Sequence, residues 1–311
     1  MNVVLLDRQT LGKDINLKKL KQFGEIKTYD TTSKNEVLDR VRNADIVITN
    51  KVKITKETMK NSNIKLICIA ATGTNNIDLE YAKKLNIPVK NVADYSTSSV
   101  AQVTFSLVLE LIQKTTYYTD YVENGGWEKS PIFTHLEKPF FEIEGKKWGI
   151  IGLGNIGKKV ASIAEAFGAD VNYYTTSGTN YNTQYNSLDL NELLKTSDII
   201  SIHSPLNEKT KNLLNKKNLT KLKDKSILVN VGRGGIINEE DLAKVIDKKE
   251  IYCALDVLEK EPIDKYNPLR CIKEKERLIM TPHIGWASIE ARNRLIDGVV
   301  KNIEEFIKKG A

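Results

Sequence analysis

The chain has 311 residues, more than one hydrophobic core usually supports, so we expect two domains. Hydrophobic residues make up 41% and charged residues 28%, which are ordinary values for a globular protein and exclude a disordered chain. The net charge of +7 is spread along the chain rather than gathered in one basic tail, so we expect no nucleic-acid partner.

Membrane and secretion signals are missing from the pattern. The apolar run near the N-terminus stops after four residues, and no stretch approaches the roughly 20 apolar residues of a membrane span. The three cysteines, Cys68, Cys253 and Cys271, are odd in number and form no C-x-x-C pair. We therefore expect reduced thiols, a cytoplasmic location and no membrane contact.

Short β-branched runs alternate with amphipathic stretches in the first third of the chain, which is typical of parallel α/β structure. The predicted helices there cover residues 35–42 and 79–85. The predicted strands are residues 3–6, 26–29, 46–49, 66–70 and 89–92.

A long apolar stretch follows at residues 98–114, with serines at its start, and predicts a helix. Because it is apolar on so much of its circumference, we expect it to be buried between domains or between subunits. Residues 117–146, with Gly125, Gly126, Pro131 and Pro139, predict an irregular segment.

Short apolar runs and amphipathic stretches then alternate again up to the C-terminus. Helices are predicted at residues 156–167, 190–195, 239–248 and 288–309. Strands are predicted at residues 147–151, 171–174, 199–203, 227–231, 253–257 and 278–280. The chain therefore predicts two α/β units, and its last helix could return to the first one, with crossings near Thr97 and Ala287.

A glycine-rich turn opens the second unit. Gly152-Leu-Gly154-Asn155-Ile156-Gly157 is a G-x-G-x-x-G motif between a predicted strand and a predicted helix. Gly152 permits the turn, Gly154 lets the backbone approach a pyrophosphate, and Gly157 lets helix and strand pack closely. The phosphates would lie at the start of the helix, near Asn155 and Ile156. The motif predicts dinucleotide binding.

The choice between NAD and NADP depends on the end of the second strand of this unit. An acidic residue there would bind the ribose of NAD, but this chain has Thr175 and Thr176 instead, with neither an acid nor an arginine. The missing carboxylate removes the repulsion that would exclude NADP. We expect NAD as the cofactor and keep NADP as an alternative.

Three later segments carry residues suited to chemistry on a keto acid. Arg233 lies between glycines just past a strand, and its planar guanidinium suits a carboxylate or an α-keto acid. His283 also follows a short strand and could supply the proton that carbonyl reduction needs. Glu261 is our candidate for the carboxylate that orients its ring. The three histidines are far apart in sequence, so we expect no metal site.

These segments together resemble the D-isomer-specific 2-hydroxyacid dehydrogenases. The resemblance covers essentially the whole chain, in the order and spacing of that family. The matching segments are Ala71-Thr72-Gly73-Thr74-Asn75-Asn76-Ile77-Asp78, Tyr95–Ala101, the glycine-rich turn, Asn230-Val-Gly-Arg233-Gly-Gly, Ala254-Leu-Asp256 through Glu261-Pro, and Thr281-Pro-His283-Ile-Gly-Trp286.

The resemblance implies a role for several residues of the matching segments. Arg233 would bind the substrate carboxylate and carbonyl, His283 would act as acid and base, and Glu261 would pair with His283. Asp256 would contact the nicotinamide carboxamide. The cofactor would also lie along Thr104, His203 and Pro205.

The resemblance also implies the domain layout and the assembly. A cofactor domain, residues 98–286, would be inserted into a discontinuous substrate domain, residues 1–97 and 287–311, and both would be Rossmann-like parallel-sheet domains. The subunits would form a homodimer through helix 98–114 and the region after it. The family usually has an acid after its second cofactor strand, and this chain departs from that pattern.

Short segments resemble the glycerate dehydrogenase and hydroxypyruvate reductase branch. Asn50 and Lys51 are polar residues that would suit a 3-hydroxyl group, and Trp286 and the backbone of Thr72-Gly73-Thr74 would complete the substrate site. We expect reduction of hydroxypyruvate or glyoxylate to D-glycerate or glycolate. A D-lactate-like or branched substrate, and an NAD(H)-sensing corepressor-like binding role, remain alternatives. Trp286 could also simply pack in the core.

Overall fold

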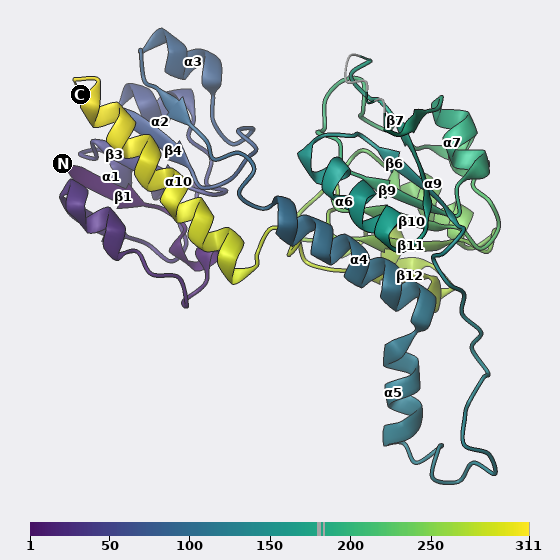
Figure 1. Ribbon diagram of the computed structural model, residues 1–311. Helices are drawn as coiled ribbons and strands as arrows, with labels where there is room; N and C mark the ends of the chain where they lie inside the picture. The colour runs from purple at the N-terminus through teal and green to yellow at the C-terminus, as the bar shows by residue number, and fades with distance from the viewer. Residues whose placement is uncertain (179–181, 183, 311) are drawn as a thin grey trace. The chain divides into compact units, whose positions relative to one another are not determined.

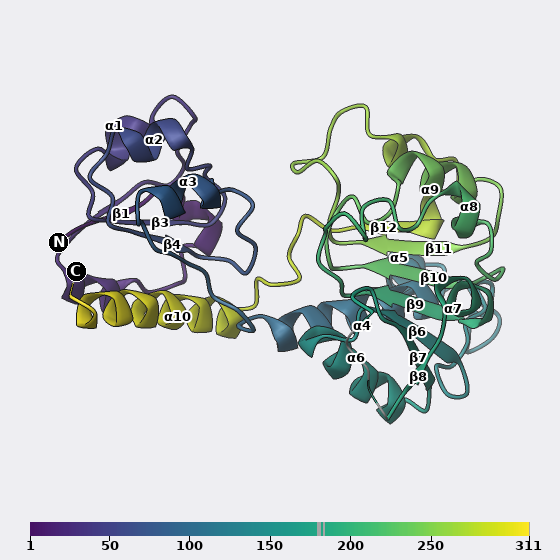
Figure 2. The same cartoon turned by 90° about the horizontal axis from the view of Figure 1, so that it is seen from above.

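The computed structural model describes residues 1–178, 182 and 184–310, and its contacts divide the chain into two compact units. The first unit comprises Met1–Ser96 and Trp286–Ala311, and the second comprises Thr97–Gly285 (Figures 1 and 2). Each unit contains one sheet in which every pairing is parallel. The predicted α/β class with two parallel-sheet units is therefore confirmed. The assignment of substrate and cofactor roles to the units stays a prediction.

The first unit is a five-stranded sheet with helices on both faces. Its strands follow the order β2-β1-β3-β4-β5, and the central strands β3 and β4 are buried along their whole length. The strands are β1 (Asn2–Leu5), β2 (Glu25–Thr28), β3 (Ile46–Thr49), β4 (Leu66–Ile69) and β5 (Val89–Lys90). The helices are α1 (Val37–Val41), α2 (Lys56–Lys60), α3 (Leu79–Lys84) and α10 (Ile289–Lys308), with 3₁₀ turns η1 (Arg8–Leu11) and η2 (Lys18–Phe23).

Helix α10 joins the first unit although it comes from the other end of the chain. Its apolar side chains, among them Leu295, Val299 and Ile303, share one core with residues of β1, β3 and β4. In Figure 1 the helix, drawn in yellow, runs along that sheet. Helices α1, α2 and α3 contribute to the core on the opposite face. The return of the C-terminal helix to the first unit follows from this apolar stripe.

The second unit is a seven-stranded sheet in the order β12-β11-β10-β9-β6-β7-β8. Its strands are β6 (Lys147–Ile151), β7 (Asp170–Tyr174), β8 (Asn186–Ser187), β9 (Ile199–Ile202), β10 (Ile227–Asn230), β11 (Tyr252–Leu255) and β12 (Leu278–Met280). The strand order reverses between β6 and β9, and such a switch point is where open α/β sheets bind ligands, beyond the carboxyl ends of the strands.

The helices of the second unit cover both faces of its sheet. They are α4 (Thr97–Gln113), α5 (Thr115–Glu123), α6 (Asn155–Ala166), α7 (Leu190–Thr196), α8 (Lys216–Leu219) and α9 (Glu239–Ile246), with 3₁₀ turns η3 (Pro268–Cys271) and η4 (Lys275–Arg277). The buried side chains of α4 belong to the core of this unit, together with residues of β6, α6 and β10. This face of α4 is therefore buried within its own unit, and the expected subunit contact stays a prediction.

The segment after α4 also differs from the prediction. Lys114 adopts a left-handed conformation with a φ of 53° and ends α4, and α5 then begins at once. Threonine and tyrosine are poor helix formers, which is why the composition of α5 did not indicate a helix. In Figure 1, α5 and the loop that follows it extend away from the sheet of the second unit.

None of the helices in the described ranges is long and apolar enough to cross a membrane.

Candidate active site

The glycine-rich turn joins β6 to α6 at the switch point of the second sheet. Gly152 has a φ of 94°, which is strained for any other residue. A Cβ atom on Gly157 would lie 2.3 Å from the Gly152 carbonyl oxygen, so helix and turn can meet only without a side chain there. Gly154 caps α6 with no side-chain bond to the first amides of the helix, and open space lies beside its Cα atom. The positive end of the α6 dipole, beside this open space, suits an anion.

A cavity of about 610 Å³ opens directly beside the glycine-rich turn. Another cavity, of about 670 Å³, lies in the first unit. The cavity beside the turn is lined by Gly152, Leu153, Gly154, Thr175, Thr176, Ser177, His203, Ser204, Pro205, Asn207, Glu208 and Lys209. Most of the predicted cofactor residues in this region therefore share one cavity. The other predicted cofactor residues are outside its lining: Thr104, Asn155, Ile156, Gly157 and Asp256. The Thr104 hydroxyl donates to the Val100 carbonyl within α4.

His203 carries a ring nitrogen without a partner beside this cavity. Trp148 Nε1 donates to Ser201 Oγ at 2.9 Å, and Ser201 Oγ lies 2.9 Å from His203 Nε2. Because the serine proton is then best placed to go to Nε2, the neutral ring carries its own proton on Nδ1. Burial lowers the pKa of His203 to about 3, which keeps the ring neutral. Among the described residues, nothing forms a hydrogen bond with the buried Nδ1 atom.

The predicted catalytic residues follow three neighbouring strands of the same sheet. Asn230 pairs with Leu255, and Leu255 with Met280, so β10, β11 and β12 end at one edge. Arg233 comes just after β10, in a turn that the Asn230 side chain stabilises. This side chain accepts from the Gly232 amide at 3.1 Å and donates to the Arg233 carbonyl at 2.9 Å. No carboxylate pairs with Arg233 within the described ranges.

The Arg233 turn packs directly against the loop that follows β11. A Cβ atom on Gly234 would lie 1.9 Å from the Leu258 carbonyl oxygen and 2.5 Å from the Glu259 nitrogen. Only glycine allows this approach. Two backbone segments that are more than 20 residues apart in sequence are therefore in contact, and the second of them leads straight to Glu261.

His283 and Glu261 form a hydrogen-bonded pair. His283 Nδ1 lies 2.7 Å from Glu261 Oε2, and the side chains are 23% and 33% exposed. The other carboxylate oxygen accepts from the Leu258 amide at 3.0 Å. With Nδ1 engaged, the Nε2 atom of the ring is the one left to exchange a proton with a ligand. His283 has a φ of 55°, so its turn needs support from elsewhere.

Asp256 supplies that support. One carboxylate oxygen accepts from Thr281 Oγ1 at 2.6 Å and from the Ile284 amide at 2.8 Å, and the other from the Gly285 amide at 2.7 Å. The side chain is almost fully buried, at 1% exposure. Sequence reasoning had assigned Asp256 to the cofactor alone and had missed that it holds the turn of His283, because the pattern does not show which amides a buried carboxylate meets.

The predicted substrate residues of the first unit lie on two loops that are tied together. Asp7 accepts from the amides of Asn50, Lys51 and Val52 at 2.7–3.2 Å, which fixes the loop after β3. Asn76 donates to the Val52 carbonyl at 3.1 Å and so joins this loop to the one after β4.

The loop after β4 contains Thr72, Gly73 and Thr74. Thr72 Oγ1 donates to the Val92 carbonyl at 3.1 Å, so this hydroxyl serves the loop itself. Trp286 packs against the core of the first unit, with its ring 6.3 Å from that of Tyr95. The contacts of these residues with substrate stay predictions.

Metal ligands do not gather in the described part of the chain, where no group of three or more His, Cys, Asp or Glu side chains could hold an ion.

A dinucleotide-type cavity at the switch point, and a histidine–carboxylate pair with an arginine turn at the same sheet edge, define a nicotinamide-dependent oxidoreductase. The model of the D-isomer specific 2-hydroxyacid dehydrogenase NAD-binding domain matches residues 105–285. The chain belongs to this family, which confirms the resemblance seen in its motifs.

Named relatives extend over nearly the whole chain. A hydroxypyruvate reductase of Blautia hydrogenotrophica is 40% identical, over 99% of this chain and 97% of its own. A glycerate dehydrogenase of Methylorubrum extorquens is 36% identical, over 98% of this chain and 96% of its own. A D-lactate dehydrogenase of Aquifex aeolicus, solved with NAD and lactic acid, is 26% identical, with a TM-score of 0.83 over 99% of this chain and 97% of that one.

Replacing Asp256 with asparagine tests its hold on the turn of His283. Asn has one acceptor where three donors converge, so we expect the free energy of unfolding to fall by about 2–4 kcal/mol, as measured in urea. Thr281→Val removes one donor and keeps the carboxylate, and should cost about 1 kcal/mol. Equal losses in the two variants would show that the three bonds do not act as described.

Proposed function

We propose that this chain reduces hydroxypyruvate, and less efficiently glyoxylate, to D-glycerate and glycolate with a nicotinamide cofactor. The observation that carries this proposal is the 2.7 Å contact between His283 Nδ1 and Glu261 Oε2, beside the Arg233 turn. Carbonyl reduction requires a proton donor next to an anion-binding cation, and these side chains supply that combination.

Each of the three side chains would have a distinct role. Arg233 would bind the substrate carboxylate and the carbonyl oxygen through its two parallel N–H groups, which also polarises the carbonyl. His283 Nε2 would give its proton to the carbonyl oxygen as this becomes a hydroxyl. Glu261 would hold the ring through Nδ1 and stabilise its charged form. In the oxidation direction His283 would take the proton back.

The residues around the glycine-rich turn suit a dinucleotide. The start of α6 suits a pyrophosphate, and His203 lines the cavity beside it. A bound reduced nicotinamide would supply the hydride that reaches the keto carbon. Asp256, whose oxygens hold the turn of His283, remains our candidate for the carboxamide contact.

The substrate assignment draws on the relatives and on the polar character of the first unit's loops. The two curated relatives described above are named for hydroxypyruvate and glycerate. Asn50 and Lys51 would bind the 3-hydroxyl that distinguishes hydroxypyruvate from pyruvate. Thr72, Gly73 and Thr74 would offer backbone amides to the carboxylate, and Trp286 would bound the site.

We also propose that the protein is a cytoplasmic homodimer. The three cysteines form no disulfide, which suits a reducing compartment. The segment after α5 exposes several large apolar side chains, including Phe133 at 88% and Leu136 at 72%. Such a surface favours a second copy of the chain over water.

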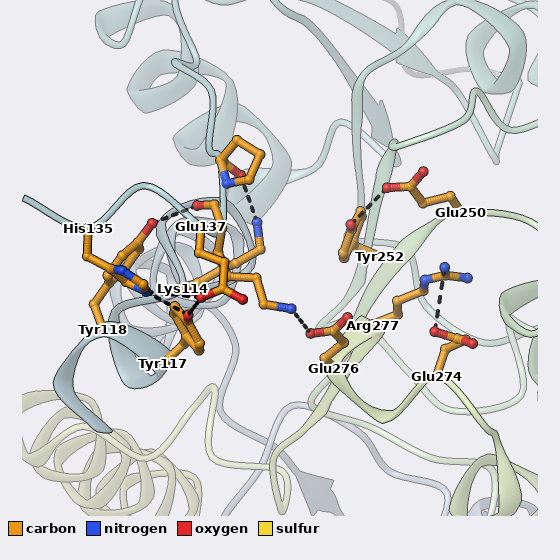
Figure 3. A network of polar contacts seen from close by, with 12 residues as sticks. Lys114, Tyr117, Tyr118, His135, Glu137, Glu250, Tyr252, Glu274, Glu276 and Arg277 are labelled. Carbon is orange, nitrogen blue, oxygen red and sulfur yellow. Dashed lines mark hydrogen bonds and ion pairs between the residues drawn. The ribbon is translucent and has the colours of Figure 1, made fainter. Parts of the chain in front are cut away.

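Polar contacts join this segment to α5, to the end of α4 and to Glu276, as Figure 3 shows. The His135 ring stacks on that of Tyr121 at 3.7 Å and meets Tyr117 Oη at 2.8 Å. Lys114 Nζ donates to the Pro139 carbonyl at 3.0 Å, and Lys138 pairs with Glu276 at 2.9 Å. An apolar surface whose conformation is held by such contacts loses less conformational entropy on docking than a mobile one. This supports the dimer proposal.

Turnover of a panel of 2-keto acids tests the activity. We expect the highest kcat/KM with hydroxypyruvate, followed by glyoxylate, and lower values with pyruvate and 2-ketoisocaproate. His283→Gln should lower kcat by about 10²–10⁴ because the proton donor is lost, with the Kd for NADH unchanged. His135→Gln is the matched control and should keep kcat. Binding of NADH without reduction of any acid in the panel would refute the enzyme proposal.

We expect the protein to discriminate only weakly between NADH and NADPH, because no carboxylate directly follows β7. We expect NADH to bind more tightly than NADPH by less than about a hundredfold, in fluorescence titrations. Thr175→Asp should weaken NADPH binding at least about tenfold, since like charges repel, and leave NADH binding nearly unchanged. Thr175→Asn controls for shape. Strong discrimination in the wild type would contradict this interpretation of the cavity.

Light scattering tests the dimer. The wild-type chain should have twice its monomer mass, and the double variant Phe133→Asp with Leu136→Asp should have the monomer mass, because charges cannot be buried in an apolar interface. Leu79→Asp, at an exposed leucine of α3, should leave the mass unchanged. A double variant that remains dimeric would place the interface elsewhere.

A further inference from the structure

Glu239 is a buried carboxylate with no assigned role. It is the first residue of α9, and only 9% of it is exposed. Among the described residues, no lysine or arginine forms an ion pair with it. Burying a carboxylate without a cation is unfavourable unless strong hydrogen bonds compensate for the lost water.

Those hydrogen bonds both come from the loop between β11 and η3. The Glu259 amide donates to Glu239 Oε1 at 2.6 Å, and Asn267 Nδ2 donates to Oε2 at 2.6 Å. The same Asn267 side chain accepts from the Leu269 amide at 3.0 Å through its oxygen. One carboxylate therefore fixes both ends of the segment 259–267.

Glu261 lies inside the segment whose ends are fixed in this way. It is two residues after Glu259, and its Oε1 atom accepts from the Leu258 amide. On the other side of the chain, Leu258 and Glu259 press against Gly234 of the Arg233 turn. The position of the Glu261 carboxylate therefore depends on a backbone segment held between Gly234 and Glu239.

We propose that Glu239 is a positioning residue for the His283–Glu261 pair, acting through the loop 259–267. This rests on the proposed function, in which Glu261 stabilises the charged form of His283. Glu239 touches neither side chain of the pair. Through this loop Glu239 determines the position of the Glu261 carboxylate. That position in turn affects how strongly His283 binds its transferable proton.

A carboxylate suits this role better than an amide of the same shape. Two donors converge on Glu239, and only a carboxylate offers an acceptor to each of them. Glu239→Gln would set an NH₂ group against either the Glu259 amide or Asn267 Nδ2, so one bond would become a donor–donor clash. The Glu261 loop would then lose one of its two anchors.

The charged groups near the pair limit the alternatives. Glu261 meets His283 directly, Asp256 holds the turn of His283, and Arg233 lies on the turn that packs against Leu258. Substitution of Glu239 leaves all of these in place. Of these groups, the Glu261 carboxylate lies on the loop that Glu239 anchors, and it contacts the His283 ring directly.

The first measurement is the pH profile of kcat/KM for hydroxypyruvate reduction. Glu261→Gln should move the alkaline limb to lower pH, because the imidazolium loses its carboxylate. Glu239→Gln should move it in the same direction by about half as much, with a roughly tenfold lower kcat and unchanged NADH affinity. In the Glu261→Gln background, Glu239→Gln should add no further shift.

Two further sets of variants test the proposal. One exchanges the acid and the amide between positions 239 and 267, and the other is a control at position 240. Asn267→Asp keeps the acceptor for Leu269 but sets two carboxylates against each other, so alone it should shift the limb like Glu239→Gln. Combining the two substitutions restores a donor opposite an acceptor and should return the limb toward the wild-type pH. Glu240→Gln, at the exposed next residue that pairs with Lys244, should change nothing.

Titration of the His283 ring by NMR, in substrate-free protein, separates this proposal from the proposed function. The chain has only three histidines, so their ring signals can be assigned by substitution. An inactive wild type would refute the function, yet the ring should still titrate at lower pH in Glu239→Gln. A folded Glu239→Gln variant with an unmoved His283 titration, or one whose shift persists in full beside Glu261→Gln, would overturn the positioning role.

Discussion

The parallel register of β10, β11 and β12 is the constraint on which the site depends. Because neighbouring parallel strands run in one direction, the residues that follow them emerge at one edge of the sheet. Arg233, Asp256 and His283 are separated by more than 20 residues each along the chain, yet each lies within a few residues of such a strand end. Loops at this edge can therefore contact one another while the strands beneath them stay rigid.

In these loops, side-chain oxygens accept hydrogen bonds from backbone amides, which regular secondary structure satisfies elsewhere in the chain. A loop that leaves a strand exposes amides that need acceptors. Asp256 provides them for the turn of His283, Glu239 for the loop of Glu261, and Asn230 for the turn of Arg233. In the first unit Asp7 does the same for the loop of Asn50. Each acceptor lies at or near a strand end or helix start, so precision in the loops comes from the scaffold.

Much of this could be predicted from the sequence, because the signals are local. Strand runs, the glycine-rich turn and the periodicity of α10 each depend on residues within one segment. The partnership of His283 with Glu261 was a reasonable hypothesis because both follow neighbouring strands. Local signals failed for α5, whose threonines and tyrosines are weak helix formers, and for α4, whose apolar face indicates burial but not by which partner.

The positions of Asp256 and Glu239 were beyond such reasoning for a different reason. An acid near a strand end or in the first turn of a helix has an ordinary local explanation, such as capping or favourable contact with the helix dipole. What distinguishes these two is the identity of their donors, which lie 20 to 29 residues away in sequence. Only the folded structure shows that both oxygens of each carboxylate accept hydrogen bonds from one loop, that of Glu261 or that of His283.

The cavity at the glycine-rich turn and the histidine–glutamate pair lie at different strand ends of the second sheet. That cavity is lined from the ends of β6, β7 and β9, whereas the His283–Glu261 pair belongs to loops after β11 and β12. Substitutions after β7 can therefore change which dinucleotide binds without moving the Glu261 loop. This explains how a chain without the usual acid after its second strand can keep the histidine–glutamate pair intact.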